Sequence, residues 1–269
     1  MVVMLKRWMQ QLRARRDEAA VLRRAIPDDL WKRTLVRYPF LQRRSAEDAA
    51  ELRRLTSLLL DRKEFSSTGG LRLTDAMTVA IAAQAALPVL RMGVAAYDGF
   101  VGIVVHPDLV SARRQHEDDN GLVHEYDEVL AGEAMQGGPV MLSWPDVRAA
   151  GLSQQGYNVV IHEFAHVLDM ADGRADGVPL LPPGLTVKAW QSALRSALQA
   201  LTARVRAGDT TLLDPYATQG DEEFFAVSSE TFFTNAVAMK KAHPAWYGML
   251  CRYYRQDPAE GGVAPRRRD

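Results

Sequence analysis

Hydrophobic and polar residues alternate along this chain mostly with the spacing of α-helices. Apolar residues recur at helical intervals near residues 186–206, 221–235 and 245–257. An Ala-rich stretch that ends near residue 86 follows Thr74, a residue type that often begins a helix. The pattern therefore predicts that helices make up most of the fold.

Three shorter runs, at residues 101–105, 122–126 and 139–143, have the composition and turn-rich flanks of β-strands. They are gathered in one part of the chain and do not alternate with helices. This arrangement predicts an α+β fold, with a mainly helical core and a small mixed or antiparallel sheet. The charged run at residues 116–120 is typical of a solvated loop.

Punctuation by small and polar residues suggests how the chain is divided. A Ser-, Thr- and Gly-rich stretch at residues 66–70 predicts a boundary between an N-terminal helical region, 1–65, and a main domain, 66–258. Residues 259–269 are expected to be a disordered tail. Residues 1–24 have the pattern of a basic amphipathic helix, which fits a packed helix better than a membrane or partner contact.

Charge and cysteine content exclude some classes of protein. The chain has 33 Lys plus Arg and 33 Asp plus Glu, so its overall charge gives no reason to expect direct nucleic-acid binding. One cysteine, Cys251, rules out a disulfide framework. No stretch has the apolar length of a membrane span or a secretory signal. We therefore expect a cytoplasmic protein, and a monomer.

The sequence HEFAH at residues 162–166 carries the clearest chemistry. Because a helical turn has about 3.6 residues, His162 and His166 point the same way and can bind one metal ion. Glu163, beside the first histidine, is placed to act as a general base. The flanking residues are apolar, which predicts that this helix is buried. The motif therefore predicts a catalytic zinc site on a buried helix.

A catalytic zinc needs a third protein ligand, and the residue pattern leaves several candidates open. Asp172 lies six residues after His166, where a metzincin-type motif has its third ligand. Such a motif requires a glycine three residues before that ligand, and here this position is Asp169. Asp169 lies on the histidine face, where it suits a hydrogen bond to His166 better than direct ligation. The Phe-rich helix 221–233 offers three glutamates that periodicity does not distinguish: Glu222, Glu223 and Glu230.

The HEFAH motif with its later partners resembles the Mlc titration factor A family of zinc metallopeptidases. The similarity extends from about Leu58 to Pro258. It includes HEFAHVLD at 162–169 and the glutamates and phenylalanines of 223–233. Further matching segments lie at residues 98–100, 121–123, 137–140, 173 and 177–179. The basic N-terminus and the tail depart from the family pattern, so partner contacts made there do not carry over.

That family is in turn similar to the peptidase domain of lethal factor, in which a tyrosine stands seven residues before the glutamate ligand, as Tyr216 does before Glu223. The resemblance implies a zincin-like fold and one zinc ion held by His162, His166 and Glu223. It also implies Glu163 as general base and Tyr216 as oxyanion stabiliser. Asp169 and Glu230 would have supporting roles.

Two classes of function follow from the resemblance. One is an aminopeptidase acting on short peptides, and the other is a regulatory protein that sequesters a glucose-responsive, Mlc-like repressor. Both could coexist, but Glu163 favours catalysis because a structural zinc site needs four ligands and no base. For substrate binding we expect an edge strand at residues 139–143, preceded by glycine, with four candidate contacts: Gly138, Pro139, Val140 and Met141.

Overall fold

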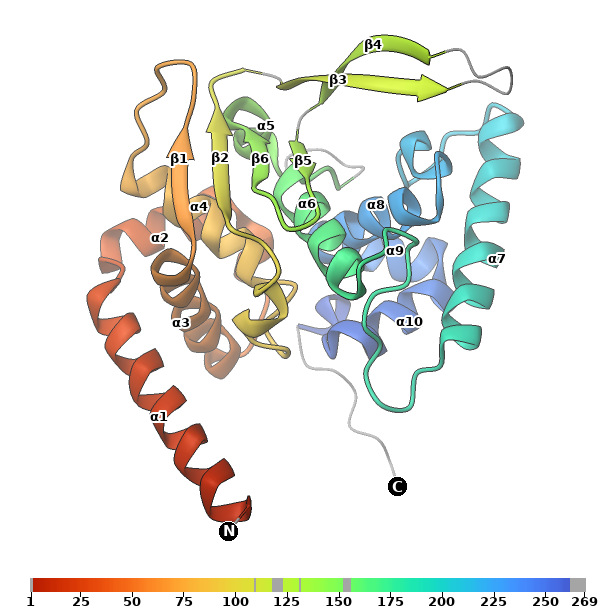
Figure 1. The fold of residues 1–269 in the computed structure, drawn as a ribbon. Helices are drawn as coiled ribbons and strands as arrows, with labels where there is room; N and C mark the ends of the chain where they lie inside the picture. The colour runs from red at the N-terminus through yellow and green to blue at the C-terminus, as the bar shows by residue number, and fades with distance from the viewer. Residues whose placement is uncertain (1, 109, 118–122, 131, 152–155, 262–269) are drawn as a thin grey trace.

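One helix, α6 (Val159–Asp169), crosses the centre of the protein between a small sheet and a group of helices (Figure 1). The computed structural model describes all residues except 1, 109, 118–122, 131, 152–155 and 262–269. The other α-helices are α1 (Val2–Arg23), α2 (Asp28–Arg37), α3 (Ala46–Arg62), α4 (Asp75–Ala86), α5 (Trp144–Ala149), α7 (Val187–Arg206), α8 (Asp221–Thr234), α9 (Ala236–Ala242) and α10 (Pro244–Tyr254). The 3₁₀ turns are η1 (Pro39–Leu41), η2 (Val94–Tyr97), η3 (Met170–Asp172), η4 (Pro215–Thr218) and η5 (Pro258–Glu260).

The sheet has four strands in the order β1-β2-β6-β5. Their bounds are β1 (Glu64–Ser67), β2 (Gly102–His106), β5 (Gly132–Ala134) and β6 (Val140–Ser143). The first three strands in that order are parallel, and β5 is antiparallel to β6. This mixed sheet beside a mainly helical body confirms the predicted α+β class.

The polar residues that precede the helices explain where several of them begin. Ser45 accepts a hydrogen bond from the backbone N–H of Asp48 at the start of α3, and Thr74 does the same for Met77 at the start of α4. Asn158 begins α6 in this way, since its side-chain oxygen accepts from the N–H of Ile161 at 2.9 Å. The orientation of the HEFAH helix is therefore fixed partly by its N-cap.

The core lies on both sides of α6. On one side, the buried ring of Phe164 packs edge-on against Tyr97 and Phe100, with centroids 4.9 and 5.5 Å apart. On the other side, α7, α8 and α10 share an aromatic cluster around Trp190 and Trp246, whose centroids are 4.8 Å apart. These contacts fix α6 and α8 firmly against their neighbours.

Among the described strands, three were not foreseen in the sequence, at residues 64–67, 110–117 and 132–134. Residues 64–67 form β1, so the boundary expected at residue 65 falls within a strand of the sheet, and the division into domains stays a prediction. The strand expected near residue 122 is β4 (Val123–Leu130), which pairs antiparallel with β3 (Val110–Glu117). The loop expected at residues 116–120 is therefore strand as far as Glu117, and 118–120 lie outside the described residues.

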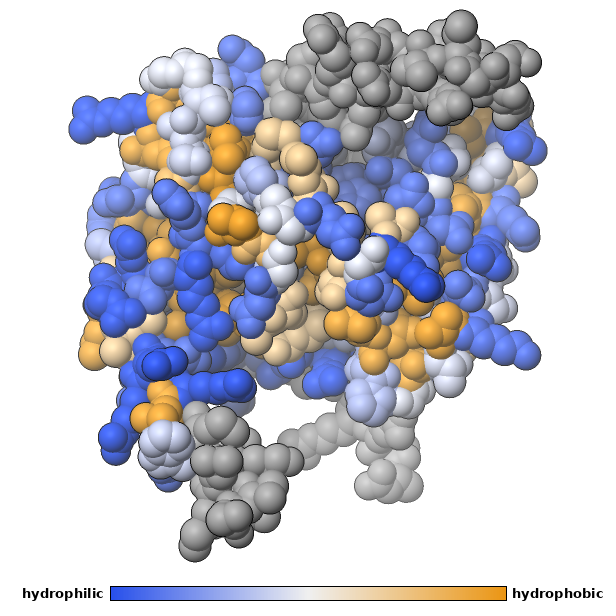
Figure 2. Space-filling model, in the orientation of Figure 1, coloured by the Kyte–Doolittle hydropathy of each residue, from blue (hydrophilic) through white to orange (hydrophobic). Residues whose placement is uncertain are grey.

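On the face shown in Figure 2, hydrophobic residues form separate patches among hydrophilic ones. None of the described helices is long and apolar enough to cross a membrane. The 3₁₀ turn η5 includes Pro258–Glu260 at the start of the segment expected to be a disordered tail, and residues 262–269 are not among those described, so the tail stays a prediction.

Candidate metal centre

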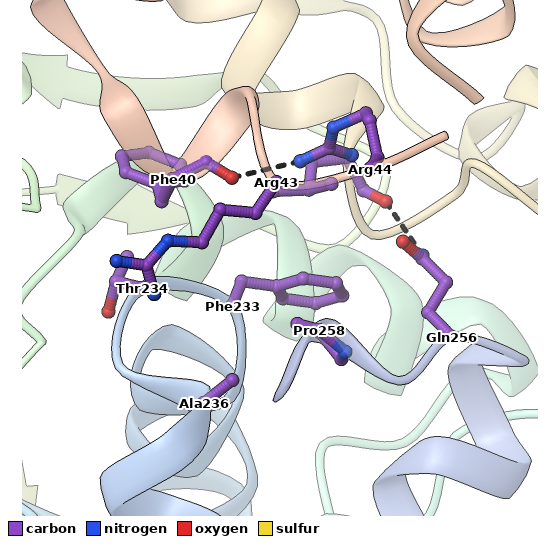
Figure 3. A pocket seen from close by; sticks show the side chains of 9 residues that line it. Phe40, Arg43, Arg44, Phe233, Thr234, Ala236, Gln256 and Pro258 are labelled. Atoms are coloured by element: carbon purple, nitrogen blue, oxygen red, sulfur yellow. Dashed lines mark hydrogen bonds between the residues drawn. The ribbon is translucent and has the colours of Figure 1, made fainter. Parts of the chain in front are cut away.

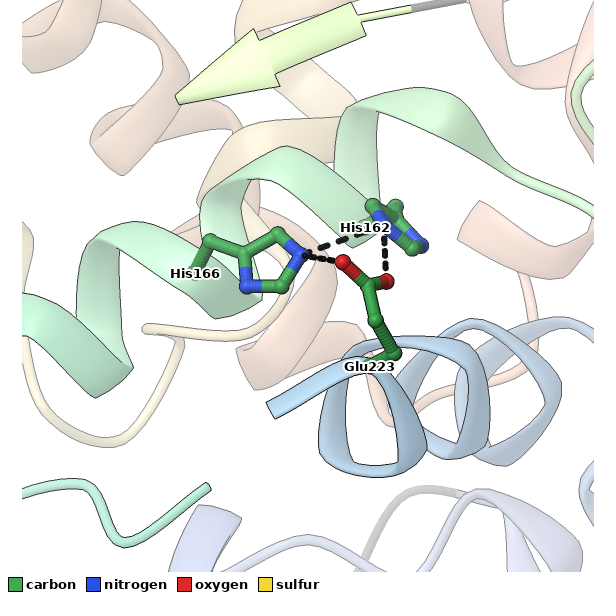
Figure 4. Close-up of side chains that lie close together, drawn as sticks. All are labelled: His162, His166 and Glu223. Atoms are coloured by element: carbon green, nitrogen blue, oxygen red, sulfur yellow. Dashed lines mark hydrogen bonds and ion pairs between the residues drawn. The ribbon is translucent and has the colours of Figure 1, made fainter. Parts of the chain in front are cut away.

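The rings of His162 and His166 lie one helical turn apart on α6, with their Nε2 atoms directed toward each other. Their Nε2 atoms are 3.2 Å apart and their ring centroids 4.8 Å apart (Figure 4). Both side chains are about one-seventh exposed, at 14% and 13%. They are therefore nearly enclosed but still reachable by a small ligand.

Glu223, in the first turn of α8, supplies the third donor group. Its Oε2 lies 3.2 Å from Nε2 of His162, and its Oε1 lies 3.5 Å from Nε2 of His166 (Figure 4). Within the described part of the chain, these three residues form the group of histidine, cysteine and acidic side chains that could hold a metal ion, with ligand atoms within 4.8 Å of one another. The structure thus joins residues that are more than fifty positions apart.

The geometry of these donors fits a tetrahedral zinc ion. Two nitrogen ligands at about 2.0–2.1 Å from one zinc are about 3.3–3.4 Å apart, close to the 3.2 Å between the histidine Nε2 atoms. Oε2 of Glu223 is buried and has no hydrogen-bond partner among the described residues, only its ionic contact with His162. A buried carboxylate oxygen left in this state is well satisfied by a cation.

The charges at the site are mutually dependent. Burial alone would raise the pKa of Glu223, but its close contacts with His162 and His166 outweigh burial and hold that pKa well below its usual range. Burial also disfavours the charged form of His162, yet contacts with Glu223 and Glu230 raise its pKa well above the ordinary value. The carboxylates therefore keep this centre attractive to positive charge.

Glu230 lies on α8 seven residues after Glu223, on the same face of the helix, and it orients the ring of His162. Its Oε1 lies 2.7 Å from Nδ1 of His162, and its other oxygen accepts from the backbone N–H of Asn158. A carboxylate at Nδ1 places the ring proton there, which leaves Nε2 as the free acceptor that faces Glu223. Glu230 is only 4% exposed, so this hydrogen bond is shielded from water.

Glu163 lies behind the histidines, 4% exposed, under strand β5. A Cβ atom added to Gly132 would come within 2.7 Å of both Cγ and Oε1 of Glu163, so only glycine allows the strand to pass this close. Burial is the main cause that raises the pKa of Glu163. Gly132 could not be identified from the sequence, because a single glycine outside a motif carries no signal of its own.

Tyr216 stands beside the site at its open side. It belongs to η4, its ring centroid is 6.2 Å from that of His162, and it is 41% exposed. The carboxylate of Asp214 accepts a hydrogen bond from the Tyr216 backbone N–H at 2.9 Å and holds the turn. The tyrosine named by the family resemblance is therefore within the neighbourhood of the three donors.

The two aspartates weighed for the site have other partners. Asp172 is exposed, and its carboxylate accepts from the backbone N–H of Arg174. Asp169 is fully buried, and its Oδ2 accepts from the backbone N–H of Gly177 at 2.9 Å, in place of the bond to His166 that the spacing suggested. Its other oxygen has no hydrogen-bond partner among the described residues, and burial raises its pKa to about 7.

The backbone of Gly177 connects the histidine helix α6 with α7 and α8. Its carbonyl accepts from Nε1 of Trp190 at 2.7 Å, while its N–H binds Asp169, three residues after His166. A Cβ at Gly177 would lie 2.4 Å from the carbonyl oxygen of Asp221, the first residue of α8. The segment between α6 and α7 thus ties the histidine helix to the helix of Glu223.

The expected substrate strand needs correction. Residues 140–143 form β6, which is paired with β2 on one side and β5 on the other, so it is not an edge strand. The edge at this end of the four-stranded sheet is β5, which passes over Glu163. A peptide could pair with β5 and not with β6, and contact by residues 138–141 stays a prediction.

Comparisons with known proteins agree with this geometry. The profile of the family described as glucose-regulated metallo-peptidase M90 matches residues 9–255. The chain belongs to the M90 metallopeptidase family. The relatives of this chain include Mlc titration factor A of Pectobacterium atrosepticum, which is 36% identical over 223 residues that cover 82% of this chain and 83% of that protein. Mlc titration factor A of Edwardsiella ictaluri is 37% identical over 225 residues, 82% of this chain and 85% of the relative.

This membership confirms the resemblance seen in the sequence and gives the site its general meaning. An M90 metallopeptidase hydrolyses peptide bonds with a metal ion, and His162, His166 and Glu223 are the candidate site for that ion. The family match begins within α1 and ends just after α10, so it includes both the sheet and the helical side of the site.

Proposed function

We propose that this protein is a zinc-dependent aminopeptidase that acts on short peptides, with Glu163 as its general base. The observation that supports this most is the group of three donor side chains, His162, His166 and Glu223, with the buried carboxylate of Glu163 beside the histidines on α6. A structural zinc site closes all four positions with protein ligands, whereas three ligands leave one for water. Zinc is favoured because two imidazoles and one carboxylate suit it in tetrahedral geometry.

Each side chain has a defined part in this proposal. A bound zinc ion supplies an acidified water and polarises the substrate carbonyl. Glu163 accepts the proton of that water and passes it to the leaving amine, a task that its raised pKa suits. The hydroxyl of Tyr216 donates a hydrogen bond to the oxygen on which negative charge develops. Glu230 keeps His162 in the tautomer and orientation that ligation requires.

The charge around the site favours a substrate with a free amino terminus. Glu163, Glu223 and Glu230 lie at the centre, and Asp214 is near enough to raise the pKa of Glu230. Even with a divalent cation bound, these carboxylates leave the site negative when they are ionised. Such a field attracts an α-ammonium group and disfavours the C-terminal carboxylate of a peptide.

The test combines zinc content with hydrolysis of amino-acyl-anilides by wild type, Glu163→Gln and the control Glu222→Gln. We expect all three to hold one zinc, and only Glu163→Gln to lose activity, by about a thousandfold or more. Hydrolysis by zinc-loaded Glu163→Gln at the wild-type rate would refute the base assignment. Cleavage of N-acetylated peptides as fast as free ones would refute the aminopeptidase.

A second function is suggested by the names of the relatives. Proteins called Mlc titration factor A match most of this chain at 33–37% identity. We propose that this protein also binds an Mlc-like repressor. Titration of purified Mlc with wild type and Glu163→Gln tests this, because binding that survives in the inactive variant separates the two functions. If neither protein binds Mlc at micromolar concentration, the regulatory role is wrong.

A further inference from the structure

An open groove lies between the loop that leads into α7 and the last two helices, α9 and α10. It encloses about 840 Å³, which is within the roughly 300–1,000 Å³ of ligand sites in proteins. Residues 182–185 form one wall, and side chains of α9, α10 and the segment after α10 form the other. None of the residues that line it belongs to the metal centre.

The segment after α10 separates this groove from a much smaller pocket. Arg255 lines the groove, whereas its neighbour Gln256 lines the small pocket, beside Arg44 (Figure 3). The Arg44 guanidinium donates to the backbone carbonyl of Phe40 at 2.9 Å, and the Gln256 amide donates to that of Leu87 at 2.9 Å. The small pocket encloses about 10 Å³, room for about one water molecule. Of these two spaces, only the groove has room for a chain segment.

The groove carries positive charge that the described residues do not neutralise. Arg255 is exposed, and its side chain makes no hydrogen bond or ion pair with the described part of the chain. Arg252 donates from Nη2 to the backbone carbonyl of Gly184 at 2.6 Å, and a carbonyl acceptor leaves the charge of the guanidinium in place. The two arginines are three residues apart at the end of α10, and both line the groove.

The acidic groups at this end of the groove are already bound to another cation. Asp257 is 5% exposed, and its Oδ1 accepts from the hydroxyl of Tyr247 at 2.6 Å. Its Oδ2 is 3.6 Å from Nζ of Lys240, which also pairs with Glu260 at 2.6 Å. Both carboxylates therefore act on Lys240, and the two arginines are left to recognise an acidic ligand.

Exposed apolar side chains extend this surface beyond the groove. Leu180, Val187 and Val237 are 63%, 53% and 60% exposed, and each is two or three residues from a residue that lines the groove. In Figure 2, one of the hydrophobic patches lies over the loop that precedes α7. An apolar surface of this extent next to free positive charge is typical of a site that binds protein, since a small molecule would leave most of it uncovered.

We propose that this groove binds an acidic peptide segment of a partner protein, with apolar side chains against the wall 182–185 and carboxylates paired with Arg252 and Arg255. The guanidinium group matches a carboxylate with two parallel N–H donors. Residues 262–269 of the chain itself have the wrong charge for this role, because they contain three arginines and one aspartate. The proposal rests on neither of the two functions proposed above.

The test is fluorescence anisotropy of labelled peptides of about eight residues, titrated with the full-length, zinc-loaded protein. Three peptides are compared: alternating Leu and Glu, alternating Leu and Lys, and alternating Ser and Glu. All are acetylated and amidated, so that their ends are not recognised as those of a substrate. The proteins are wild type, Arg255→Gln and the control Arg24→Gln. Arg24 is also exposed and without a side-chain partner among the described residues.

We expect the Leu-Glu peptide to bind wild type and Arg24→Gln with a Kd of about 100 μM or less, and Arg255→Gln about fivefold more weakly. The Ser-Glu peptide should bind more weakly than the Leu-Glu peptide, and the Leu-Lys peptide should not bind. Equal binding of the Leu-Lys peptide would overturn the acidic ligand. Equal affinity of wild type and Arg255→Gln for the Leu-Glu peptide would overturn the site. So would the absence of saturable binding at about 1 mM protein.

The single cysteine, Cys251, lines the groove and reports directly whether it is occupied. Burial raises the pKa of its thiol to about 12, so alkylation by iodoacetamide is slow enough to follow by mass spectrometry. A saturating amount of the Leu-Glu peptide should slow this alkylation by about threefold or more, because the bound peptide covers the thiol. A peptide bound at the metal centre would leave the rate unchanged, and an unchanged rate would therefore overturn the proposal.

Discussion

The two helices of the metal centre, α6 and α8, are built in opposite ways. α6 is two-sided, with nearly enclosed histidines facing the site and Phe164 facing the core. In α8, every residue from Phe224 to Phe233 is buried, so its polar side chains are surrounded by protein as completely as its apolar ones. The comparison teaches that a ligand on a two-sided helix is visible in the periodicity, whereas Glu223, in the partly buried first turn that precedes this buried stretch, is identified only by what it contacts.

The strongest test of this comparison removes one ligand from each helix. We expect His162→Ala and Glu223→Ala each to lower zinc affinity by about a thousandfold. In structural zinc sites four protein ligands share a binding free energy of roughly 10–16 kcal/mol, so one ligand accounts for about 2.5–4 kcal/mol, or up to about a thousandfold in affinity. Competition with a chromophoric chelator measures this, with Asp172→Ala as a control that should bind normally. A loss confined to the α6 variant would show that α8 does not hold the metal.

A second test loosens the connection between the helices without touching a ligand. In Gly177→Ala the new Cβ meets the Asp221 carbonyl, and the backbone keeps a φ of +71° that favours glycine. We expect the free energy of unfolding to fall by about 2–4 kcal/mol, with weaker zinc binding. The matched control is Gly208→Ala, where φ is +75° but nothing lies within 4 Å. Its expected loss, measured by urea denaturation, is about 1 kcal/mol.

If the two variants lose equal stability, the close approach at Gly177 has no energetic weight. In that case the segment after α6 does not set the position of Glu223. Unchanged zinc affinity in a clearly destabilised Gly177→Ala would lead to the same conclusion about the metal centre.

A third test concerns the carboxylate through which α8 acts on α6. Glu230→Gln keeps the shape of the side chain but removes the charge that faces Nδ1 of His162. We expect zinc affinity to fall by about ten- to a hundredfold, because such partners orient and polarise the ligand. Glu222→Gln, on the same helix, should bind zinc like the wild type. Equal affinities in both variants would exclude an electrostatic role for Glu230.

The smallest expected effect comes from strand β5. Gly132→Ala displaces Glu163 but no metal ligand, so kcat should fall by about tenfold while zinc content stays at one per chain. The displacement is limited because an edge strand can shift. Gly99→Ala, where an added Cβ meets nothing within 4 Å, should keep full activity. Loss of zinc from Gly132→Ala would mean that the strand supports the ligands themselves.

Helices were predicted more accurately than strands. α3 and α4 begin where Ser45 and Thr74 indicated, because an N-cap acts through residues only three positions away. β1 is four residues long, contains two serines and pairs with β2 nearly forty residues later. Its parallel neighbour supplies the hydrogen bonds that make it a strand, and local sequence carries little sign of such a partner. The interior position of β6 was missed for the same reason.

The sequence alone determined the HEFAH pair, because the angle between His162 and His166 is a property of a single helix with 3.6 residues per turn. It also indicated, through family resemblance, that Glu223 and Tyr216 belong with them. Only the tertiary structure decided that Glu230 bonds to His162, that Asp169 turns to Gly177, and that Gly132 makes room for Glu163. These contacts join residues from 8 to 68 positions apart in two cases, and β5 to α6 in the third. Such distances are set by how elements pack, and packing depends on the whole chain.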